Sequence, residues 1–314
     1  MSFINVLAPG FQTSVQGASR LGYTQLGVSP SGAADFFSLR LGNILVGNPQ
    51  RAAALEMTLV GSELVFENQA IIALAGSDFG PTLDGKPIPI WSAIAVGARQ
   101  KLQLSSTKSG ARCYLCIRGG IDVPLLLGSA STHLTTKMGG YEGRALKKGD
   151  VLFFRNGNEK QSKAATLDLP SLSPYLHRDV VRVTEALQTI HFNEKNLNLF
   201  SSSAYTVSEN SNRMGLRLKG HPIRSLRSSE IMTEGVPLGA VQVPSDGQPI
   251  ISFVEHQTTG GYPKIANVIA ADIHRVGQLR PRDSVRFEWV TIEQAIQSLR
   301  EQEQFIQMVE EKFS

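Results

Sequence analysis

The sequence contains little cysteine and no long apolar run, and both absences narrow the classes of protein to consider. No stretch of its 314 residues approaches the roughly 20 apolar residues of a membrane-spanning helix, so we predict no membrane insertion. Residues 1–10 lack the basic and apolar regions of a secretory signal, and we expect a cytoplasmic protein. The net charge is only +4 and no dense Lys/Arg run occurs, which argues against nucleic-acid binding.

The two cysteines, Cys113 and Cys116, have the CxxC spacing of a redox motif or of half a zinc site. On a strand, an offset of three places the two side chains on opposite faces, and the sequence has no second cysteine pair. The six histidines also lack the spacing of metal ligands. We therefore predict no metal site and interpret both thiols as buried packing residues in a reducing compartment.

Short β-branched segments bounded by Gly, Pro, Asp or Ser dominate the chain and predict a mainly β protein. Two helices are predicted as well: residues 33–46, which stop at a Gly-Asn-Pro signal, and residues 291–312, which carry an apolar stripe. The predicted strands are 4–8, 62–67, 70–76, 88–96, 101–105, 112–119, 150–154, 181–186, 249–254, 266–273 and 284–290.

The composition becomes polar and rich in Pro and Ser between Asn156 and Arg178, where we place a domain boundary. We predict an N-terminal β domain at 1–160 with one inserted helix, a C-terminal β domain at 176–290 and a C-terminal helix at 291–314. The segments 144–154 and 277–287 share a leucine, a basic residue, a turn aspartate and a closing strand. This echo indicates either a duplicated β unit or chance.

The segment GPTLDGKP matches the first part of the phosphate-binding pattern G-x-x-x-x-G-K through Gly80, Gly85 and Lys86. However, Pro87 occupies the place of the Ser or Thr that the pattern requires, and strands rather than a helix flank the segment. We therefore predict a hairpin turn at Asp84 and Gly85 instead of an ATP site.

The segment QTTGGYPKIA, residues 257–266, places two hydroxyls, an amide, a phenol and a cation around a glycine pair and a proline. Two predicted buried strands flank it, so the polar loop has a rigid base, which is typical of binding loops. His256 at its mouth is either a general base or a histidine that hydrogen-bonds a strand end. Glu255 is the carboxylate alternative for a base.

Three other segments also place small and polar residues around glycine, and their recurrence suggests one shared cleft. Residues 27–35 present Ser31 either to an anion or as a helix cap. Residues 128–144 contain Thr132 and Arg144. Residues 208–220 contain Asn212 and Arg213, whose guanidinium suits bidentate binding of a carboxylate.

Taken together, these segments resemble the family of C-type subunits of 5-oxoprolinase, also described as allophanate hydrolase subunit 2 or the carboxyltransferase domain of urea carboxylase. The resemblance runs in order from about Phe3 to Trp289 and implies two tandem cyclophilin-like β-barrel domains with a few helices. It also implies two partners, the B-type and A-type subunits of 5-oxoprolinase. Together they complete an ATP-dependent enzyme, with ATP bound by the complex, that opens 5-oxo-L-proline to L-glutamate. The motifs are GVSPSGAAD, LGNILVGNP, GGIDVP, GSAST, GGYEGRALKKGD, SNRMGLRLKG, VPSDGQPI and QTTGGYPKIANVIAAD.

Two alternative functions stay open at this point. One is a biotin-dependent carboxyltransferase that acts on urea or a related amide; biotin would come from a partner, because Lys137-Met138 alone does not make an attachment motif. The other is a non-catalytic regulator that binds a B-type subunit resembling a kinase inhibitor. In each case the chain alone is expected to show little turnover.

The sequence departs from the family pattern at three places: His133, Glu255 and residues 183–188. These departures bear on substrate identity more than on fold. The working hypothesis is that the QTT amide and hydroxyls bind a planar amide and stabilise oxyanion charge, while nearby cations hold a carboxylate. The predicted catalytic residues are Glu255, Gln257, Thr258, Thr259 and Lys264, and the predicted substrate-binding residues are Asn212, Arg213, Gly260, Gly261, Tyr262, Ser31, Thr132 and Arg144.

Overall fold

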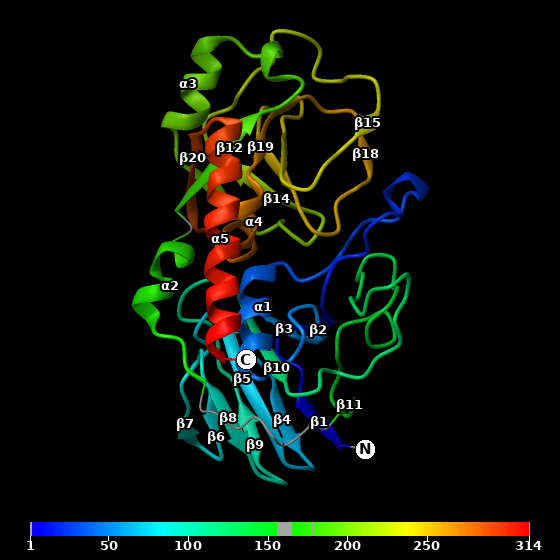
Figure 1. The fold of residues 1–314 in the computed structure, drawn as a ribbon. Helices are drawn as coiled ribbons and strands as arrows, with labels where there is room; N and C mark the ends of the chain where they lie inside the picture. Colours follow the sequence, from blue (N-terminus) through cyan, green and yellow to red (C-terminus); the bar gives the residue numbers. More distant parts are fainter. Residues whose placement is uncertain (1, 156–164, 178, 314) are drawn as a thin grey trace. The chain divides into compact units, whose positions relative to one another are not determined.

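The structure, a computed structural model, describes residues 2–155, 165–177 and 179–313 (Figure 1). Internal contacts group the chain into two compact units. The first comprises Met1–Arg20, Ser31–Pro174 and Gln304–Ser314, and the second comprises Leu21–Pro30 and Tyr175–Glu303. Helix α5 (Ile292–Phe313) contributes residues to both units. The boundary predicted at 156–178 falls partly on 156–164 and 178, which lie outside the described residues.

Two antiparallel sheets and helix α1 (Phe36–Leu45) form most of the first unit. The strand orders are β11-β1-β4-β9-β6-β7 and β2-β3-β10-β5-β8. The strands are β1 (Ser2–Ala8), β2 (Gln12–Gln16), β3 (Ala54–Thr58), β4 (Glu63–Phe66), β5 (Ala70–Gly76), β6 (Thr82–Leu83), β7 (Lys86–Pro87), β8 (Ala93–Val96), β9 (Lys101–Gln103), β10 (Arg112–Ile117) and β11 (Val151–Phe154).

Both sheets contribute to one apolar core, in which Ile4 of β1 packs in the same cluster as Leu55 of β3. Strand β10 is buried along its whole length, because α1 packs against β10 and β5 (Figure 1). Cys113 belongs to the core cluster, whereas the Cys116 Sγ lies 3.7 Å from the Leu39 carbonyl oxygen of α1. The two free thiols therefore lie on opposite faces and are buried, as predicted.

Helix α1 begins at an aspartate cap. The Asp35 carboxylate accepts hydrogen bonds from the Ser38 backbone N–H at 2.8 Å and from its hydroxyl at 2.6 Å. This side chain satisfies a backbone donor that the first helical turn leaves without a partner. The alternative that Ser31 caps the helix is wrong, because its hydroxyl donates to the Thr132 carbonyl instead, at 2.8 Å.

The second unit is a closed barrel with the strand order β12-β19-β16-β17-β14-β13-β20. Strands β12 and β20 pair in parallel, and the remaining neighbours that are described pair antiparallel. Its strands are β12 (Val180–Glu185), β13 (Tyr205–Val207), β14 (Gly215–Lys219), β16 (Ala240–Gln242), β17 (Ile250–Ser252), β19 (Lys264–Val268) and β20 (Ser284–Trp289), and outside the barrel β15 (Glu234–Gly235) pairs with β18 (Thr259–Gly260).

Short helices accompany the barrel. The ring of Phe200 stacks on Phe287 of β20, with centroids 4.4 Å apart, and this pair closes one side of the barrel core. None of the helices in the described part of the chain is long and apolar enough to cross a membrane. The helices besides α1 and α5 are α2 (Leu169–Leu176), α3 (Glu194–Ser202), α4 (Ile273–Gly277) and the 3-10 turns η1 (Thr24–Leu26), η2 (Thr189–His191) and η3 (Ala270–Asp272).

The prediction of a mainly β protein with a few helices, one of them C-terminal, is confirmed, but several predicted strands are shorter than expected, most of all those at 88–96 and 266–273. Within 88–96 only β8 is extended, because Trp91 has φ +61 and interrupts the strand. Within 266–273 the strand ends at Val268, and the helical turns η3 and α4 follow. The hairpin predicted at Asp84 and Gly85 is confirmed: both have positive φ, at +48 and +78, between the paired strands β6 and β7.

The echo between 144–154 and 277–287 extends to the backbone. Asp150 accepts a hydrogen bond from the Lys147 N–H at 2.7 Å, and Asp283 accepts one from the Arg280 N–H at 2.9 Å. The preceding residues, Gly149 and Arg282, both have positive φ, at +91 and +73. Each aspartate starts a strand at the next residue, so the two units contain the same turn, which favours duplication over chance.

Candidate functional site

The polar loop connects β17 to β19, as the flanking strand predictions required. Its backbone is held by the segment around β15. The Val236 N–H donates to the Thr258 carbonyl at 3.0 Å, the Ile231 N–H donates to the Gly261 carbonyl at 2.7 Å, and β15 pairs with β18 between these contacts. The loop is therefore a fixed arch and not a free connection.

A cavity of about 430 Å³ lies on the outer wall of the barrel, next to this loop. Strands β14, β17 and β16 supply part of its lining. Inward residues such as Leu216 and Ile251 are buried in the barrel, and the residues that alternate with them face the cavity. The lining consists of Asn212, Met214, Gly215, Arg217, Gln242, Ile250, Ser252, His256, Gln257, Gly260, Gly261 and Tyr262.

The two glycines of the loop are closely packed. A Cβ at Gly260 would lie 3.0 Å from Val236 Cγ2 and 3.2 Å from Gln242 Nε2, and one at Gly261 would lie 3.0 Å from the Ile231 carbonyl oxygen. Larger residues would push the arch away from the barrel wall. The glycine pair thus lets the loop pack closely against Val236, Gln242 and Ile231.

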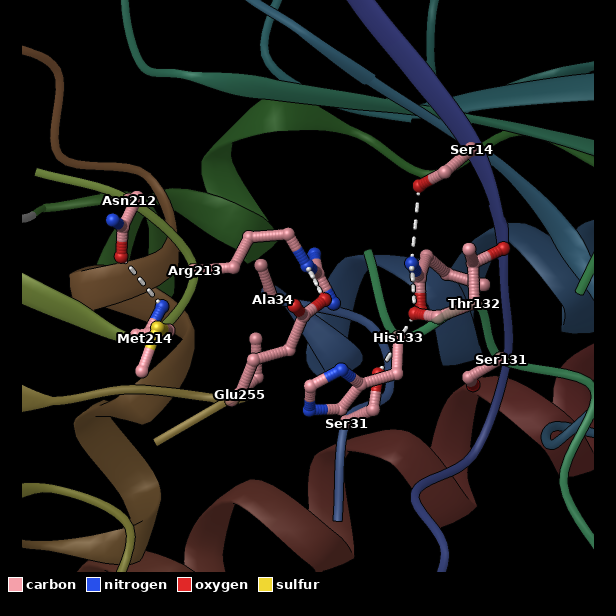
Figure 2. Close-up of polar contacts among 12 residues, drawn as sticks. Ser14, Ser31, Ala34, Ser131, Thr132, His133, Asn212, Arg213, Met214 and Glu255 are labelled. Atoms are coloured by element: carbon pink, nitrogen blue, oxygen red, sulfur yellow. Dashed lines mark hydrogen bonds and ion pairs between the residues drawn. The ribbon is translucent and has the colours of Figure 1, made fainter. Parts of the chain in front are cut away.

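Asn212 is fixed at the cavity by an Asx turn. Its Oδ1 accepts a hydrogen bond from the backbone N–H of Met214 at 2.8 Å (Figure 2). It also accepts one from the Gly215 N–H at 3.3 Å. Across the lining, the Ser252 hydroxyl donates to Gln242 Oε1 at 3.3 Å. In both amides the oxygen is engaged, which leaves the amide N–H₂ as the group that can donate to a ligand.

His256 lines the cavity and is neutral near pH 7. Burial lowers the pKa of its imidazole below the usual 6.5, and the hydrogen bond to the Gln257 carbonyl only partly opposes this shift. That bond joins Nδ1 to the carbonyl oxygen at 2.8 Å, so Nδ1 carries the proton. The other nitrogen, Nε2, is then an acceptor with the properties of a general base.

Arg213 and Glu255 form a buried ion pair. The Arg213 Nε lies 2.6 Å from Glu255 Oε1, and the residues are 5% and 2% exposed (Figure 2). The Glu255 N–H also donates to the Arg213 carbonyl at 2.8 Å. Each is next to a lining residue in sequence, Arg213 to Asn212 and Glu255 to His256, but neither is itself among the residues that line the cavity.

Lys264 is likewise buried and paired. Its ammonium binds the Glu234 carboxylate, and this hydrogen bond lowers the pKa of Glu234. Gln188 joins the network, because its Nε2 donates to Glu234 Oε1 at 2.9 Å and its Oε1 accepts from the Lys264 N–H at 3.3 Å. Gln188 belongs to the segment 183–188, where the sequence departs from the family pattern. A residue of that segment therefore helps to hold the base of the loop.

Three predicted site residues belong to the first unit. Ser31 and Thr132 are buried and joined by the Ser31 hydroxyl bond to the Thr132 carbonyl (Figure 2). Arg144 binds both oxygens of Asp150, at 2.7 and 3.0 Å, and these bonds raise the pKa of Arg144. The departure residue His133 is also buried, and its Nδ1 lies 2.9 Å from the Thr136 hydroxyl.

The structure therefore brings five predicted residues to the cavity, and it adds others that the sequence did not single out. Among the additions, Arg217, Gln242 and Ser252 come from strands whose register no local pattern reveals. The alternation in GLRLK could have indicated that Arg217 faces outward. No cluster of three or more potential metal ligands occurs within the described residues. The five predicted residues are Asn212, Gln257, Gly260, Gly261 and Tyr262.

Comparisons with known proteins support the resemblance that the sequence motifs predict. A family model described as carboxyltransferase domain, subdomain A and B, matches residues 26–289. The chain is 35% identical to the C-type subunit of 5-oxoprolinase from Haemophilus influenzae and 34% identical to that from Escherichia coli. Both alignments cover 98% of this chain and 97% of the relative.

Among solved structures, the Kluyveromyces lactis urea amidolyase contains a region of the same fold. It matches 98% of this chain with a TM-score of 0.90 and 36% sequence identity. The match covers 20% of the urea amidolyase chain, so this chain spans about one fifth of the length of that relative. The predicted family resemblance is thereby confirmed.

Proposed function

The chain belongs to the family of carboxyltransferase domains with subdomains A and B, and from this premise we propose that it is the C-type subunit of an ATP-dependent 5-oxoprolinase. The reaction is the opening of 5-oxo-L-proline to L-glutamate, in a complex with the B-type and A-type subunits. Support comes from the two relatives named as C-type subunits of 5-oxoprolinase, which align over 97% of their length. The urea amidolyase aligns over only 20% of its own.

The observation that carries this proposal is the cavity on the barrel wall. It is about 430 Å³, large enough for a five-membered lactam, and amide donors, a hydroxyl and a neutral imidazole line it. Lactam hydrolysis requires a group that holds the planar amide and a group that accepts a proton. The cavity offers both from residues of the second unit alone.

In this proposal His256 Nε2 accepts a proton from the attacking water as the water oxygen bonds to the lactam carbonyl carbon, and it returns that proton to the ring nitrogen as the bond between carbon and nitrogen breaks. Nε2 is the nitrogen that can do this, since Nδ1 is bound to the Gln257 carbonyl. The amide groups of Asn212 and Gln257 hold the lactam oxygen, and Tyr262, which is 43% exposed, forms the outer wall. Glu255 takes a positioning role through its ion pair with Arg213. Oxyanion donors of this kind typically contribute about 3 kcal/mol each.

The described glycine-lysine segment at Gly80–Lys86 does not fit the phosphates of a nucleotide. The segment with glycine-lysine spacing forms the β6–β7 hairpin, so it offers no helix amides to phosphate. We propose that ATP binds elsewhere in the complex. The roles proposed for residues of this chain do not involve ATP. Biotin, if used at all, is supplied by a partner.

Reconstitution tests the proposal. The chain is co-expressed with the B-type and A-type subunits, and ATP-dependent formation of L-glutamate from 5-oxo-L-proline is measured. We expect turnover by the complex and little by the chain alone. A fully assembled complex that binds ATP but leaves 5-oxo-L-proline intact would contradict the assignment.

A biotin-dependent carboxyltransferase acting on urea or a related amide is the second candidate, and the close structural match to the urea amidolyase favours it. Avidin distinguishes the two reactions, because it sequesters biotin. Carboxylation of urea or a related amide that avidin abolishes and that requires bicarbonate supports the carboxyltransferase. Opening of 5-oxo-L-proline that avidin leaves unchanged supports the 5-oxoprolinase.

A further inference from the structure

The floor of the cavity contains a row of three side chains on adjacent barrel strands. Arg217 of β14 pairs with Ile250 of β17, and Ile250 pairs in turn with Gln242 of β16. All three line the cavity. Two strand spacings, about 10 Å in total, separate the ends of this row. The row therefore places a cation at one end, an apolar surface in the middle and an amide at the other end.

Arg217 carries a charge that the described residues do not neutralise. Its guanidinium has no ion pair among them, whereas its backbone is fixed by the turn before β14. The Arg217 N–H donates to the Ser211 hydroxyl at 3.0 Å, and its carbonyl accepts from the Ser208 N–H at 2.8 Å. The strand is thus rigid while the charged group is available to a ligand.

The remaining lining reinforces this positive character. Within the described part of the chain, the lining contains no Asp or Glu, and Arg217 is its single Lys or Arg. The two other cations near the loop, Arg213 and Lys264, are buried against Glu255 and Glu234. A ligand in the cavity therefore meets one uncompensated positive charge and amide donors, which is the environment of an anion site.

We infer that Arg217 binds the carboxylate of the substrate and thereby selects an anionic lactam over neutral amides such as urea. The inference rests on the proposed function and adds the residue that sets substrate class. With the carboxylate on Arg217, the ring of 5-oxo-L-proline lies over Ile250. The lactam group then points toward Gln242 and the loop.

The test compares two lactams in the reconstituted complex: 5-oxo-L-proline and 2-pyrrolidinone, which is the same ring without the carboxylate. For Arg217→Gln we expect the KM for 5-oxo-L-proline to rise about 10- to 100-fold, the range of a lost charge-assisted hydrogen bond. The response to 2-pyrrolidinone, measured as substrate or competitive inhibitor, stays unchanged. Arg217→Lys keeps the charge but not the bidentate geometry, and should fall between these values.

Lys219→Gln is the matched control. Lys219 is exposed at the next outward position of β14 and is not a lining residue, so its loss removes the same charge from the same strand face. We expect wild-type kinetics for this variant.

Each outcome decides between the two claims. If wild type opens 5-oxo-L-proline and Arg217→Gln discriminates between the lactams as wild type does, the inference fails and the proposed function stands. The inference also fails if the variant weakens both lactams equally. If wild type binds and opens neither lactam, the proposed function fails, and the inference with it.

Discussion

At the scale of single residues, the loop is flanked by charges that the fold has already neutralised. Arg213 is paired with Glu255, and Lys264 with Glu234. A buried ion pair adds little net stability, because the cost of desolvation offsets the attraction. Removing one partner is nevertheless strongly destabilising, because it leaves a buried charge without compensation. The sequence interpretation of Arg213 and Lys264 as substrate ligands stays a prediction, and their geometry favours a role in holding the loop.

Replacing Arg213 should therefore affect stability first. Arg213→Ala leaves the Glu255 carboxylate buried without its partner, and we expect a loss of about 3–5 kcal/mol in the free energy of unfolding. Urea denaturation measures this loss. The double variant Arg213→Met with Glu255→Gln removes both charges and should recover much of it. Wild-type stability of Arg213→Ala would show that the pair does not hold the loop.

His256 should make stability depend on pH. Its folded pKa is lower than its unfolded value of 6.5, so the unfolded chain binds the proton more readily. The contribution is therefore complete above about pH 6.5 and is lost as the pH falls through the lower folded pKa. Denaturation curves measured from about pH 7.5 to about pH 5, a range that spans the usual histidine pKa, should show this decline in the free energy of unfolding.

The variant His256→Gln should flatten that part of the stability profile. His221→Gln, which changes an exposed histidine, should leave it as in wild type. Equal profiles for wild type and His256→Gln would show that burial of the imidazole does not govern its titration.

At the scale of elements, the repeated aspartate turn links the two units. Both turns hold a residue at positive φ immediately before the aspartate, and this residue is Gly149 in one and Arg282 in the other. Glycine adopts that conformation without strain, whereas a side chain opposes it. The same backbone conformation is therefore adopted by a glycine, which suits it, in the first turn and by an arginine, which does not, in the second.

Substitutions at the two positions should act in opposite directions. Gly149→Ala should destabilise by about 1 kcal/mol, because a Cβ strains the left-handed conformation. No heavy atom lies within 4 Å of that Cβ, so the effect reports backbone strain alone. Arg282→Gly should be neutral or stabilising. Thermal unfolding of both variants checks this, and a loss at Arg282→Gly as large as that at Gly149→Ala would contradict the equivalence of the turns.

At the scale of the whole molecule, the two thiols report on the integrity of the first unit. Cys113 packs in the core between the sheets, and Cys116 packs against α1. Burial raises the pKa of both thiols well above the usual value. Reactivity therefore requires the unit to open.

We expect neither thiol to react with a disulfide reagent in the native protein, and both to react in urea. The labelling rate in intermediate urea should follow the unfolding transition seen by circular dichroism. The variants Cys113→Ser and Cys116→Ser each remove one thiol and assign the signals. Rapid labelling of the native protein would show that one face of β10 is open to solvent.

Most of the confirmed structural predictions came from local sequence patterns. Strands such as β5 and β10, helices α1 and α5, the Asp84–Gly85 hairpin and the rigid base of the polar loop all follow from patterns within a few residues. Such patterns report which side chains need burial and where φ is positive, both of which are properties of short segments. The family resemblance added expectations about partners and reaction, which local patterns do not contain.

The sequence by itself determined that this is a mainly β protein with a polar glycine loop between two buried strands. Only the tertiary structure decided which polar groups face the cavity. Arg213 and Arg217 stand four residues apart, yet the first is buried against Glu255 and the second lies in a cross-strand row with Ile250 and Gln242. The physical reason is that partners and register are set by strands distant in sequence, so the free charge appears only after the barrel has closed.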